Sequence, residues 1–240
     1  MSQYTTIIQG PLKSSSPSLN SIEKYKSYGD VVISTYINDI FDENFPQEKI
    51  TGTKIVAIDL PKKQPEVLES RNHDTFYYAL RTMYNGVMQV TTPYVIKTRS
   101  DESWSTFDPF IKEFEKNNES LVCGNIFARP WCQYPFHFGD HIFIIKRDYL
   151  GKALHFLLEN LHKNILPFDH IAESVLLQCI MQAMQVPIDE VTFKKIVNIV
   201  DINKVKNFTA SFNHALTPSG RQIFVNEFVN PHGVYSNSDL

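Results

Sequence analysis

Cysteines are few in this 240-residue chain, and their spacing is irregular. The three of them, Cys123, Cys132 and Cys179, do not form the paired spacing of a zinc site. An odd number with no regular spacing also does not favour a disulfide framework. We therefore expect a protein of a reducing compartment, with the cytosol as the predicted location.

Long apolar runs are missing as well. No run approaches the ~20 apolar residues that a bilayer-spanning helix needs. Residues 1–6 show no basic stretch followed by an apolar block, so we expect no secretion signal. Any membrane contact is therefore expected to be peripheral, at the membrane surface.

The chain also lacks an excess of one charge. It has 23 Lys and Arg residues against 26 Asp and Glu residues, a net charge of −3. Extended nucleic-acid binding normally requires a clustered basic surface, so nucleic acid is not an expected partner. Hydrophobic residues at 42% and charged residues at 20% are ordinary globular values. We predict one domain over residues 1–240, with a nucleotide-binding half over about 1–104 and a substrate half over about 105–240.

What is present is an alternation of two periodicities. Apolar, β-branched segments predict strands over residues 5–9, 30–36, 54–60 and 94–99. Helical spacing predicts helices over 18–28 and 72–90. This cadence is typical of an α/β protein with a mainly parallel sheet flanked by helices, in which the carboxyl ends of the strands share one edge. The second half predicts strands over 120–127 and 140–146, and helices over 107–116, 148–161 and 172–184. From residue 191 onward no element is predicted.

An acidic pair, Asp101 and Glu102, follows the fourth predicted strand. Ligands of open α/β sheets bind at the carboxyl ends of strands. A carboxylate there can hold Mg²⁺ or Mn²⁺ while substrate phosphates complete the coordination shell. The pair is therefore a candidate metal site. The alternative is a structural role in which Asp101 caps the next helix or pairs with Arg99.

Two cations precede that pair. Lys97 and Arg99 alternate with apolar or neutral residues, so they point to one face of their strand. A buried cation pair is costly without anions, which phosphate groups would supply. The alternative is that this segment is already a loop and both cations are solvated. Arg71 lies just before the long predicted helix, where backbone N–H groups also attract anions. We predict an anion-binding role for all three.

Aromatic residues and a carboxylate gather in the loop over 129–140. Trp131 and Tyr134 offer flat surfaces for sugars, His137 lies beside them, and Asp140 can orient or deprotonate a hydroxyl. The alternative is a small aromatic core over the sheet edge. Glu173 lies on a very apolar predicted helix, where a carboxylate needs a partner or a function, or else satisfies the helix N-terminus.

Several of these segments together resemble a known family. They are Gln9-Gly10-Pro11 after the first strand, the strand ending at Tyr36, the long helix, and the segment from Tyr94 through Lys97-Thr-Arg-Ser-Asp101. Over roughly residues 5–180 they are similar to the WavE-type lipopolysaccharide-synthesis family and to the small GT-A glycosyltransferases of large DNA viruses. The resemblance implies a GT-A fold, a nucleotide-sugar donor, with UDP the expected nucleotide, beside Gln9, Gly10 and Pro11, and Mn²⁺ or Mg²⁺ held by Asp101.

One departure from the GT-A pattern concerns the metal. GT-A enzymes commonly carry Asp-x-Asp, whereas this chain has Arg99-Ser-Asp101. Only the last carboxylate remains, so either the metal is held weakly with many water ligands, or Arg99 replaces part of its charge. Glu102 is a candidate second ligand, directly or through a water molecule. The resemblance also implies acceptor-side carboxylates at Asp140 and Glu173, without deciding which is the base.

The predicted function is transfer of a hexosyl or deoxyhexosyl group from a nucleotide diphosphate to a glycan or lipid-linked acceptor, as in polysaccharide or lipopolysaccharide biosynthesis. The expected setting is the cytosol of a bacterium or of a virus-infected host cell. Trp131, Tyr134 and His137 are the predicted acceptor contacts. Two alternatives remain, a sugar nucleotidyltransferase and a non-catalytic glycan-binding module. The first would normally show a glycine-rich basic loop after strand one.

Overall fold

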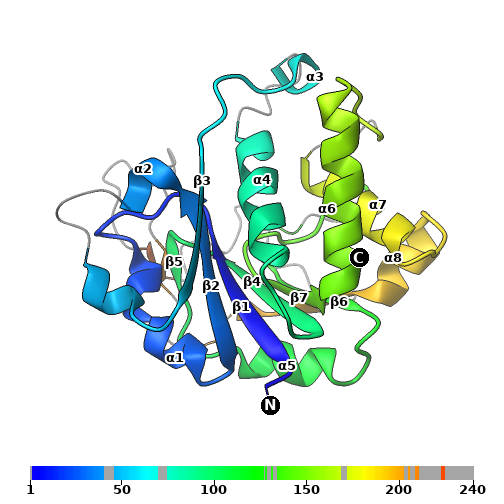
Figure 1. Ribbon diagram of the computed structural model, residues 1–240. Helices are drawn as coiled ribbons and strands as arrows, with labels where there is room; N and C mark the ends of the chain where they lie inside the picture. Colours follow the sequence, from blue (N-terminus) through cyan, green and yellow to red (C-terminus); the bar gives the residue numbers. More distant parts are fainter. Residues whose placement is uncertain are drawn as a thin grey trace.

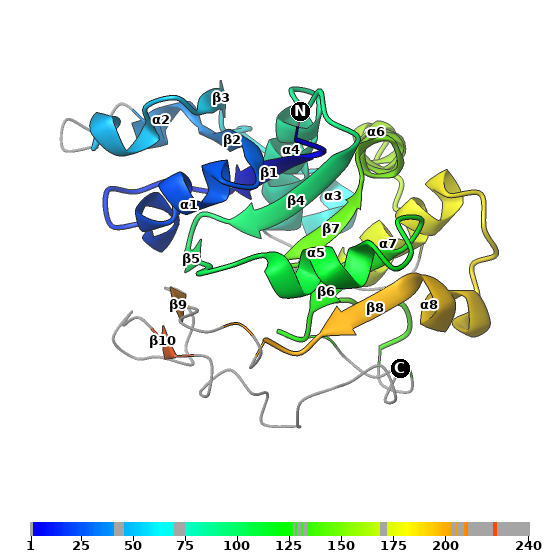
Figure 2. The same cartoon turned by 90° about the horizontal axis from the view of Figure 1, so that it is seen from below.

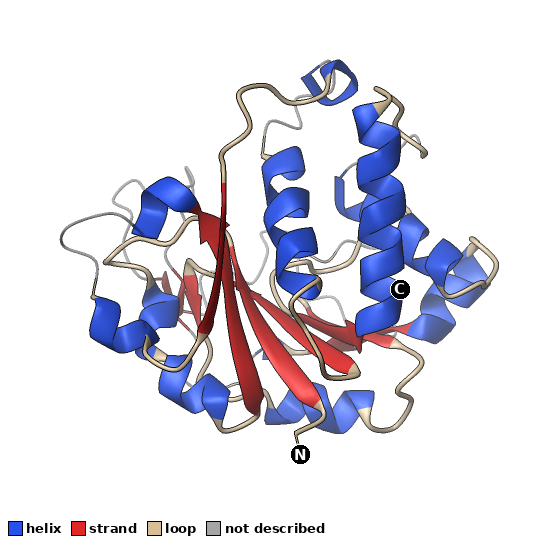
Figure 3. Ribbon diagram, in the orientation of Figure 1, coloured by secondary structure: helices blue, strands red, loops and turns tan. Residues whose placement is uncertain are grey.

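A seven-stranded sheet forms the centre of the molecule, in the order β3-β2-β1-β4-β7-β6-β8 (Figure 3). The computed structural model describes residues 2–40, 46–69, 75–126, 128, 131, 134–168, 172–202, 205, 209–210 and 223–224. The strands of the sheet are β1 (Tyr4–Gln9), β2 (Gly29–Tyr36), β3 (Lys54–Ile58), β4 (Tyr94–Arg99), β6 (Leu121–Gly124), β7 (Phe143–Lys146) and β8 (Val197–Val200). Only β7 runs antiparallel to its neighbours in this sheet. The predicted fold class, a mixed and mainly parallel sheet flanked by helices, is confirmed.

Helices cover both faces of the sheet (Figures 1 and 2). Successive strand residues point to opposite faces, so Ile7 and Val95 pack on one side while Ile8 and Ile96 pack on the other. The first side is covered by α4 (Phe76–Val87), α6 (Arg147–His162), α7 (Ala172–Ala183) and α8 (Glu190–Ile196). The second side is covered by η1 (Pro17–Asn20), α1 (Ile22–Lys26) and α5 (Asp108–Phe114). Short elements complete the chain: α2 (Ile37–Ile40), η2 (Gln47–Ile50) and α3 (Glu66–Glu69).

Helix α4 lies very close to the sheet. A Cβ added at Gly86 would lie 2.9 Å from Cγ2 of Ile7 and 3.1 Å from Cβ of Ser34. The missing side chain therefore lets the helix approach β1 and β2. Leu80, Met83 and Val87 of this helix are buried. The helix is described from Phe76, and residues 70–74 at the predicted start lie outside the described part of the chain.

Several boundaries differ from the predictions. The helix predicted over 18–28 is divided into the 3-10 turn η1 and the short helix α1, with Pro17 opening the turn. The strands predicted over 120–127 and 140–146 shorten to β6 and β7. Helix α8 was not predicted, although Asp189 caps it by accepting a hydrogen bond from the backbone N–H of Thr192 at 2.8 Å. That Asp-x-x-Thr spacing is a readable helix start.

The order in which successive strands are added to the sheet reverses at β1. Strands β2 and β3 extend the sheet on one side of β1, while β4 lies on the other side, so a crevice opens beyond the carboxyl ends of β1 and β4. The register aligns Gln9 with both Ser34 and Arg99, so these strand ends share one edge as predicted. Because β7 is antiparallel, the residues that precede it, including Asp140, reach this same edge.

A second, three-stranded sheet adjoins this edge (Figure 2). It has the order β10-β9-β5, where β5 is Glu102–Ser103, β9 is Thr209–Ala210 and β10 is Ile223–Phe224. Strand β5 pairs antiparallel with β9, which was not predicted. None of the helices in the described residues is long and apolar enough to cross a membrane.

Candidate active site

A cavity of about 780 Å³ lies at the carboxyl edge of the sheet, at the ends of β1 and β4, where the strand order reverses (the β1–β4 switch). Its size suits a small-molecule ligand. The β2 end and α4 contribute the rings of Tyr36 and Tyr78, whose centroids lie 6.5 Å apart. Of the predicted site residues, the cavity wall brings together Gln9, Gly10, Pro11, Arg99, Asp101 and Asp140.

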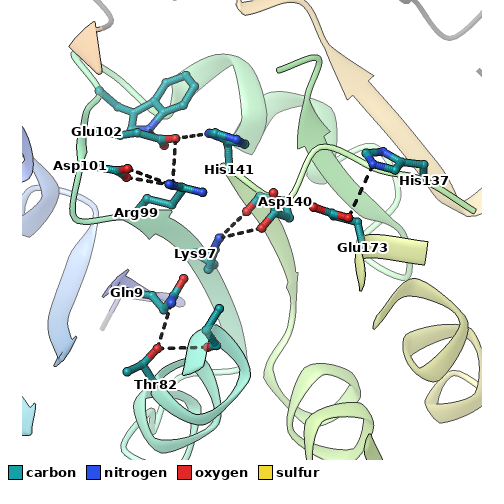
Figure 4. A network of polar contacts seen from close by, with 12 residues as sticks. Gln9, Thr82, Lys97, Arg99, Asp101, Glu102, His137, Asp140, His141 and Glu173 are labelled. Atoms are coloured by element: carbon teal, nitrogen blue, oxygen red, sulfur yellow. Dashed lines mark hydrogen bonds and ion pairs between the residues drawn. The ribbon is translucent and has the colours of Figure 1, made fainter. Parts of the chain in front are cut away.

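The loop after β1 is held by its neighbours on both sides. Gln9 Nε2 donates to Thr82 Oγ1 at 2.9 Å, which ties it to α4 (Figure 4). Gly10 N donates to the carbonyl oxygen of Ser34 at 3.1 Å, and Ser100 Oγ donates to the carbonyl oxygen of Pro11 at 2.5 Å. The cavity wall is therefore fixed by β2, β4 and α4 together.

Gly10 is required by backbone geometry. Its φ is +116°, and an added Cβ would lie 3.2 Å from Ser100 Oγ. Gly10→Ala is therefore expected to cost roughly 1–3 kcal/mol of unfolding free energy, measured by urea denaturation. Gly151→Ala, within α6, is the matched control, because its Cβ would meet Val87 Cγ1 of α4 at 3.5 Å, an ordinary contact. The control should gain roughly 0.5–1 kcal/mol from helix propensity. Equal stability of Gly10→Ala and wild type would contradict this interpretation.

Arg99 and Asp101 form a two-point ion pair at the cavity wall (Figure 4). Arg99 Nε donates to Asp101 Oδ1 at 2.8 Å, and Nη2 donates to Oδ2 at 2.7 Å. Each side chain is 29% exposed, so both are accessible from the cavity. Burial opposes the charged form of both groups, but their mutual hydrogen bonds and attraction prevail. The pKa of Asp101 is therefore lowered and that of Arg99 is raised.

Lys97 and Asp140 form a second pair, below the first. Lys97 is fully buried, and its Nζ donates to the backbone oxygen of Asp140 and lies 3.7 Å from Oδ2. Its ammonium group also lies 5.6 Å from the ring centre of Phe143. Burial lowers the pKa of Lys97, against the attraction of Asp140. Burial works against the charge of Asp140 too, yet Lys97, His141 and Arg99 lower the pKa of that carboxyl to about 2.

Glu102 does not reach the cavity. Its side chain is fully buried behind Arg99, with Oε2 accepting from Trp104 Nε1 at 3.0 Å. Oε1 is hydrogen-bonded by His141 Nδ1 and lies 3.7 Å from Arg99 Nε. This placement differs from the expected metal-ligand position, because the carboxylate points into the protein toward three nitrogen donors. In this conformation it is not presented to a ligand in the cavity.

The acceptor-side residues divide into two groups. Glu173 lies beside Asp140 in the first turn of α7, with Oε2 3.7 Å from His137 Nε2 (Figure 4). Burial and the nearby charge of Asp140 raise the pKa of Glu173. Tyr134 is exposed and its ring lies 6.1 Å from that of His137. Asp140 is the member of this acidic and aromatic group that lines the cavity.

Trp131 is placed differently from the expected stacking surface. Its ring centre lies 4.5 Å from that of Phe136 and 5.3 Å from that of Phe193. The indole therefore packs against the core cluster, as in the alternative interpretation of this loop as an aromatic mini-core. Arg71, a predicted donor contact, lies outside the described residues.

Asp39 and His141 are among the residues of this region that were not predicted. Asp39 lines the cavity, and its Oδ2 accepts from Leu12 N at 3.3 Å, Thr35 Oγ1 at 2.7 Å and Tyr36 N at 3.3 Å. It joins the loop after β1 to the end of β2. The sequence pattern that could have indicated this role is an Asp four residues after a Thr near the end of a strand. His141, the partner of Glu102, carried no spacing signal, because its role depends on the β4–β7 pairing.

No family model and no curated protein sequence matches this chain. Solved structures with a similar fold include a glucosyl-3-phosphoglycerate synthase from Mycobacterium tuberculosis in complex with Mn²⁺, UDP and phosphoglyceric acid. It is 10% identical with a TM-score of 0.48, and the match covers 83% of this chain and 69% of that one. A protein assigned as a glucose-1-phosphate thymidylyltransferase from Bacillus anthracis is 9% identical, with a TM-score of 0.46 and coverages of 87% and 89%. HddC from Yersinia pseudotuberculosis is 11% identical, with a TM-score of 0.39 and coverages of 62% and 79%.

Proposed function

We propose that this protein is a GT-A-type glycosyltransferase that takes a sugar from a nucleotide diphosphate, with UDP as the expected nucleotide. The observation that carries the proposal is the cavity at the β1–β4 switch, where Arg99 and Asp101 face the loop Gln9–Pro11. Nucleotides bind α/β sheets at this kind of crevice. The rings of Tyr36 and Tyr78 in the cavity wall supply aromatic surface for a base, and Arg99 supplies a cation for phosphate.

The charge of the cavity wall favours a divalent cation. The cavity wall carries two cations, Lys13 and Arg99, and three carboxylates, Asp39, Asp101 and Asp140. A bound diphosphate would add further negative charge, which a dication would balance. Within the described chain, no three His, Cys, Asp or Glu side chains are grouped to hold a metal ion by themselves.

A metal held by one or two carboxylates plus substrate phosphates needs no such group. Asp101 fits this role, because it is accessible from the cavity and its lowered pKa keeps it ionised. Mn²⁺ or Mg²⁺ bound there would supply Lewis-acid stabilisation of the leaving diphosphate.

The acceptor side of the proposal uses Asp140 and Glu173. The acceptor hydroxyl oxygen bonds to the anomeric carbon as the bond from that carbon to the diphosphate oxygen breaks, and the hydroxyl proton passes to a carboxylate. Of the two, Glu173 suits proton abstraction better, because its raised pKa makes it the stronger base. Asp140, with a pKa of about 2, is the weaker base and serves as a fixed anion beside Lys97. A glycan or lipid-linked acceptor would contact Tyr134, which is exposed, whereas the predicted contact His137 is buried beside Glu173.

Calorimetry tests this proposal directly. UDP titrated into the protein with Mn²⁺ is expected to give binding heat that falls sharply when EDTA removes the metal. A panel of UDP-sugars should then release UDP slowly by transfer to water or faster with an acceptor. Binding of glycans without any heat from UDP would favour the glycan-binding module. Release of pyrophosphate from a nucleoside triphosphate and a sugar phosphate would favour the nucleotidyltransferase.

A further inference from the structure

Glu102 is next to the cavity-wall residue Asp101 in the chain, but its ionisable side chain faces away from the cavity. Its side chain is 0% exposed, although its neighbours Asp101 and Arg99 are accessible from the cavity. Taking a carboxylate out of water is costly unless hydrogen bonds and opposite charge compensate for it. An apolar side chain of similar size would often give equal or higher stability in such a place. The carboxylate therefore calls for an explanation beyond core packing.

The side chains around Glu102 are rigidly held. Trp104, which donates to Oε2, is fully buried and packs edge-on against Phe110 with centroids 5.6 Å apart. The backbone N–H of Trp104 donates to Tyr25 Oη at 2.9 Å, and Tyr25 stacks on Phe107 at 4.7 Å. Glu102 is thus attached to the core formed by α1, α5 and the sheet. These contacts hold the carboxylate oxygens of Glu102 in place behind the cavity wall.

Arg99 lies between this fixed carboxylate and the accessible one. Its guanidinium forms two hydrogen bonds with Asp101, while its Nε lies 3.7 Å from Glu102 Oε1 (Figure 4). We propose that Glu102 is a positioning residue, a buried anion that holds Arg99 at the cavity wall for the donor diphosphate. Asp101 alone would not suffice, because the same oxygens are needed for a divalent cation. With Glu102 behind it, Arg99 keeps an anionic partner while Asp101 binds the metal.

His141 is held by the same carboxylate. Its Nδ1 hydrogen-bonds Glu102 Oε1, and it directly follows Asp140 in the chain. Glu102 therefore links the β4 end, which carries Arg99 and Asp101, to the segment before β7, which carries Asp140. In metal sites, groups that hold a ligating side chain in place commonly contribute about 10–100-fold to affinity or activity without touching the metal, and we expect a similar magnitude here.

This inference rests on the proposed function, and a double-mutant cycle tests it. Glu102→Gln keeps the size and an oxygen for Trp104 but removes the charge. We expect it to weaken UDP binding in the presence of Mn²⁺ by about tenfold. In an Arg99→Ala background the same change should have almost no effect, because a positioning residue acts through Arg99. Additive losses of affinity in the two variants would overturn the proposal.

The controls separate positioning from folding. Glu23→Gln removes an exposed carboxylate paired with Lys26 and should bind UDP like wild type. If Glu102→Gln does not fold, Glu102→Asp, which keeps the charge on a shorter side chain, takes its place in the cycle. Failure of both variants to fold while Glu23→Gln folds would assign Glu102 a purely structural role and overturn the proposal.

A second measurement does not depend on nucleotide binding. In ¹⁵N-labelled protein, the Nε–H signal of Arg99 can be identified by its loss in Arg99→Lys. It should be sharp and protected in wild type, and shifted and broadened in Glu102→Gln. An unchanged signal would overturn the positioning role. If wild type does not bind UDP, the proposed function fails, while this signal still decides whether Glu102 holds Arg99.

Discussion

Asp101→Asn is expected to reduce the release of UDP from a UDP-sugar by at least about 100-fold, a loss typical of removing a key charge-stabilising group. Asp101 is the carboxylate of the cavity wall that faces Arg99, and its pKa is lowered, so it is anionic at neutral pH. The amide that replaces it is neutral, so it is a weaker ligand for Mn²⁺ or Mg²⁺ than the carboxylate. It also removes one partner of the two-point pair with Arg99. Both effects act on the diphosphate end of the donor.

The measurement is a coupled assay of released UDP with saturating Mn²⁺, together with thermal unfolding by circular dichroism. The melting temperature should change by only a few degrees, because Asp101 is partly exposed. Asp148→Asn is the matched control, since that carboxylate is 65% exposed and pairs with Arg147 on α6. Full metal-dependent activity of Asp101→Asn would remove Asp101 from the proposed mechanism.

The sheet could be predicted from the sequence because its strands are local patterns. The run from Val31 to Tyr36 is buried throughout, and that continuity is readable without any tertiary information. The helical pattern over 18–28 was less reliable, because Pro17 opens a 3-10 turn that the apolar spacing does not reveal. Strand β9 was unreadable, since two residues, Thr209 and Ala210, are strand only through pairing with β5.

Some residues of the cavity wall could be predicted from the sequence for a related reason. Gln9 and Arg99 end neighbouring parallel strands, and parallel topology brings such ends together. Strand topology does not, however, determine the direction in which a side chain just beyond the end of a strand points. Asp101 and Glu102 are adjacent acidic residues in the sequence, yet one borders the cavity while the other is fully buried. Only the three-dimensional positions of Trp104 and His141 explain the difference.

Lys97→Met is expected to destabilise the protein by about 3–5 kcal/mol, the cost of breaking a buried ion pair from one side. Lys97 is fully buried on the central strand β4, and its ammonium group contacts the backbone oxygen of Asp140 and faces its carboxylate. Methionine fills a similar volume but leaves both oxygens without this donor. The free energy of unfolding from urea titrations at pH 7 measures the loss. Lys63→Met, at a side chain that is 62% exposed, should leave the stability almost unchanged.

The pH dependence provides the second arm of this test. The pKa of Asp140 is lowered from 3.8 to about 2, so its ionised form adds stability that is present above about pH 4 and lost as the pH falls through 2. This contribution is on the order of 2 kcal/mol at neutral pH, and about half of it should be gone at pH 3. The double variant Lys97→Met with Asp140→Asn should lack this part of the dependence and recover some of the stability lost in Lys97→Met. A Lys97→Met protein within 1 kcal/mol of wild type at pH 7, against the 3–5 kcal/mol expected of a broken buried pair, would show that Lys97 does not compensate the charge of Asp140.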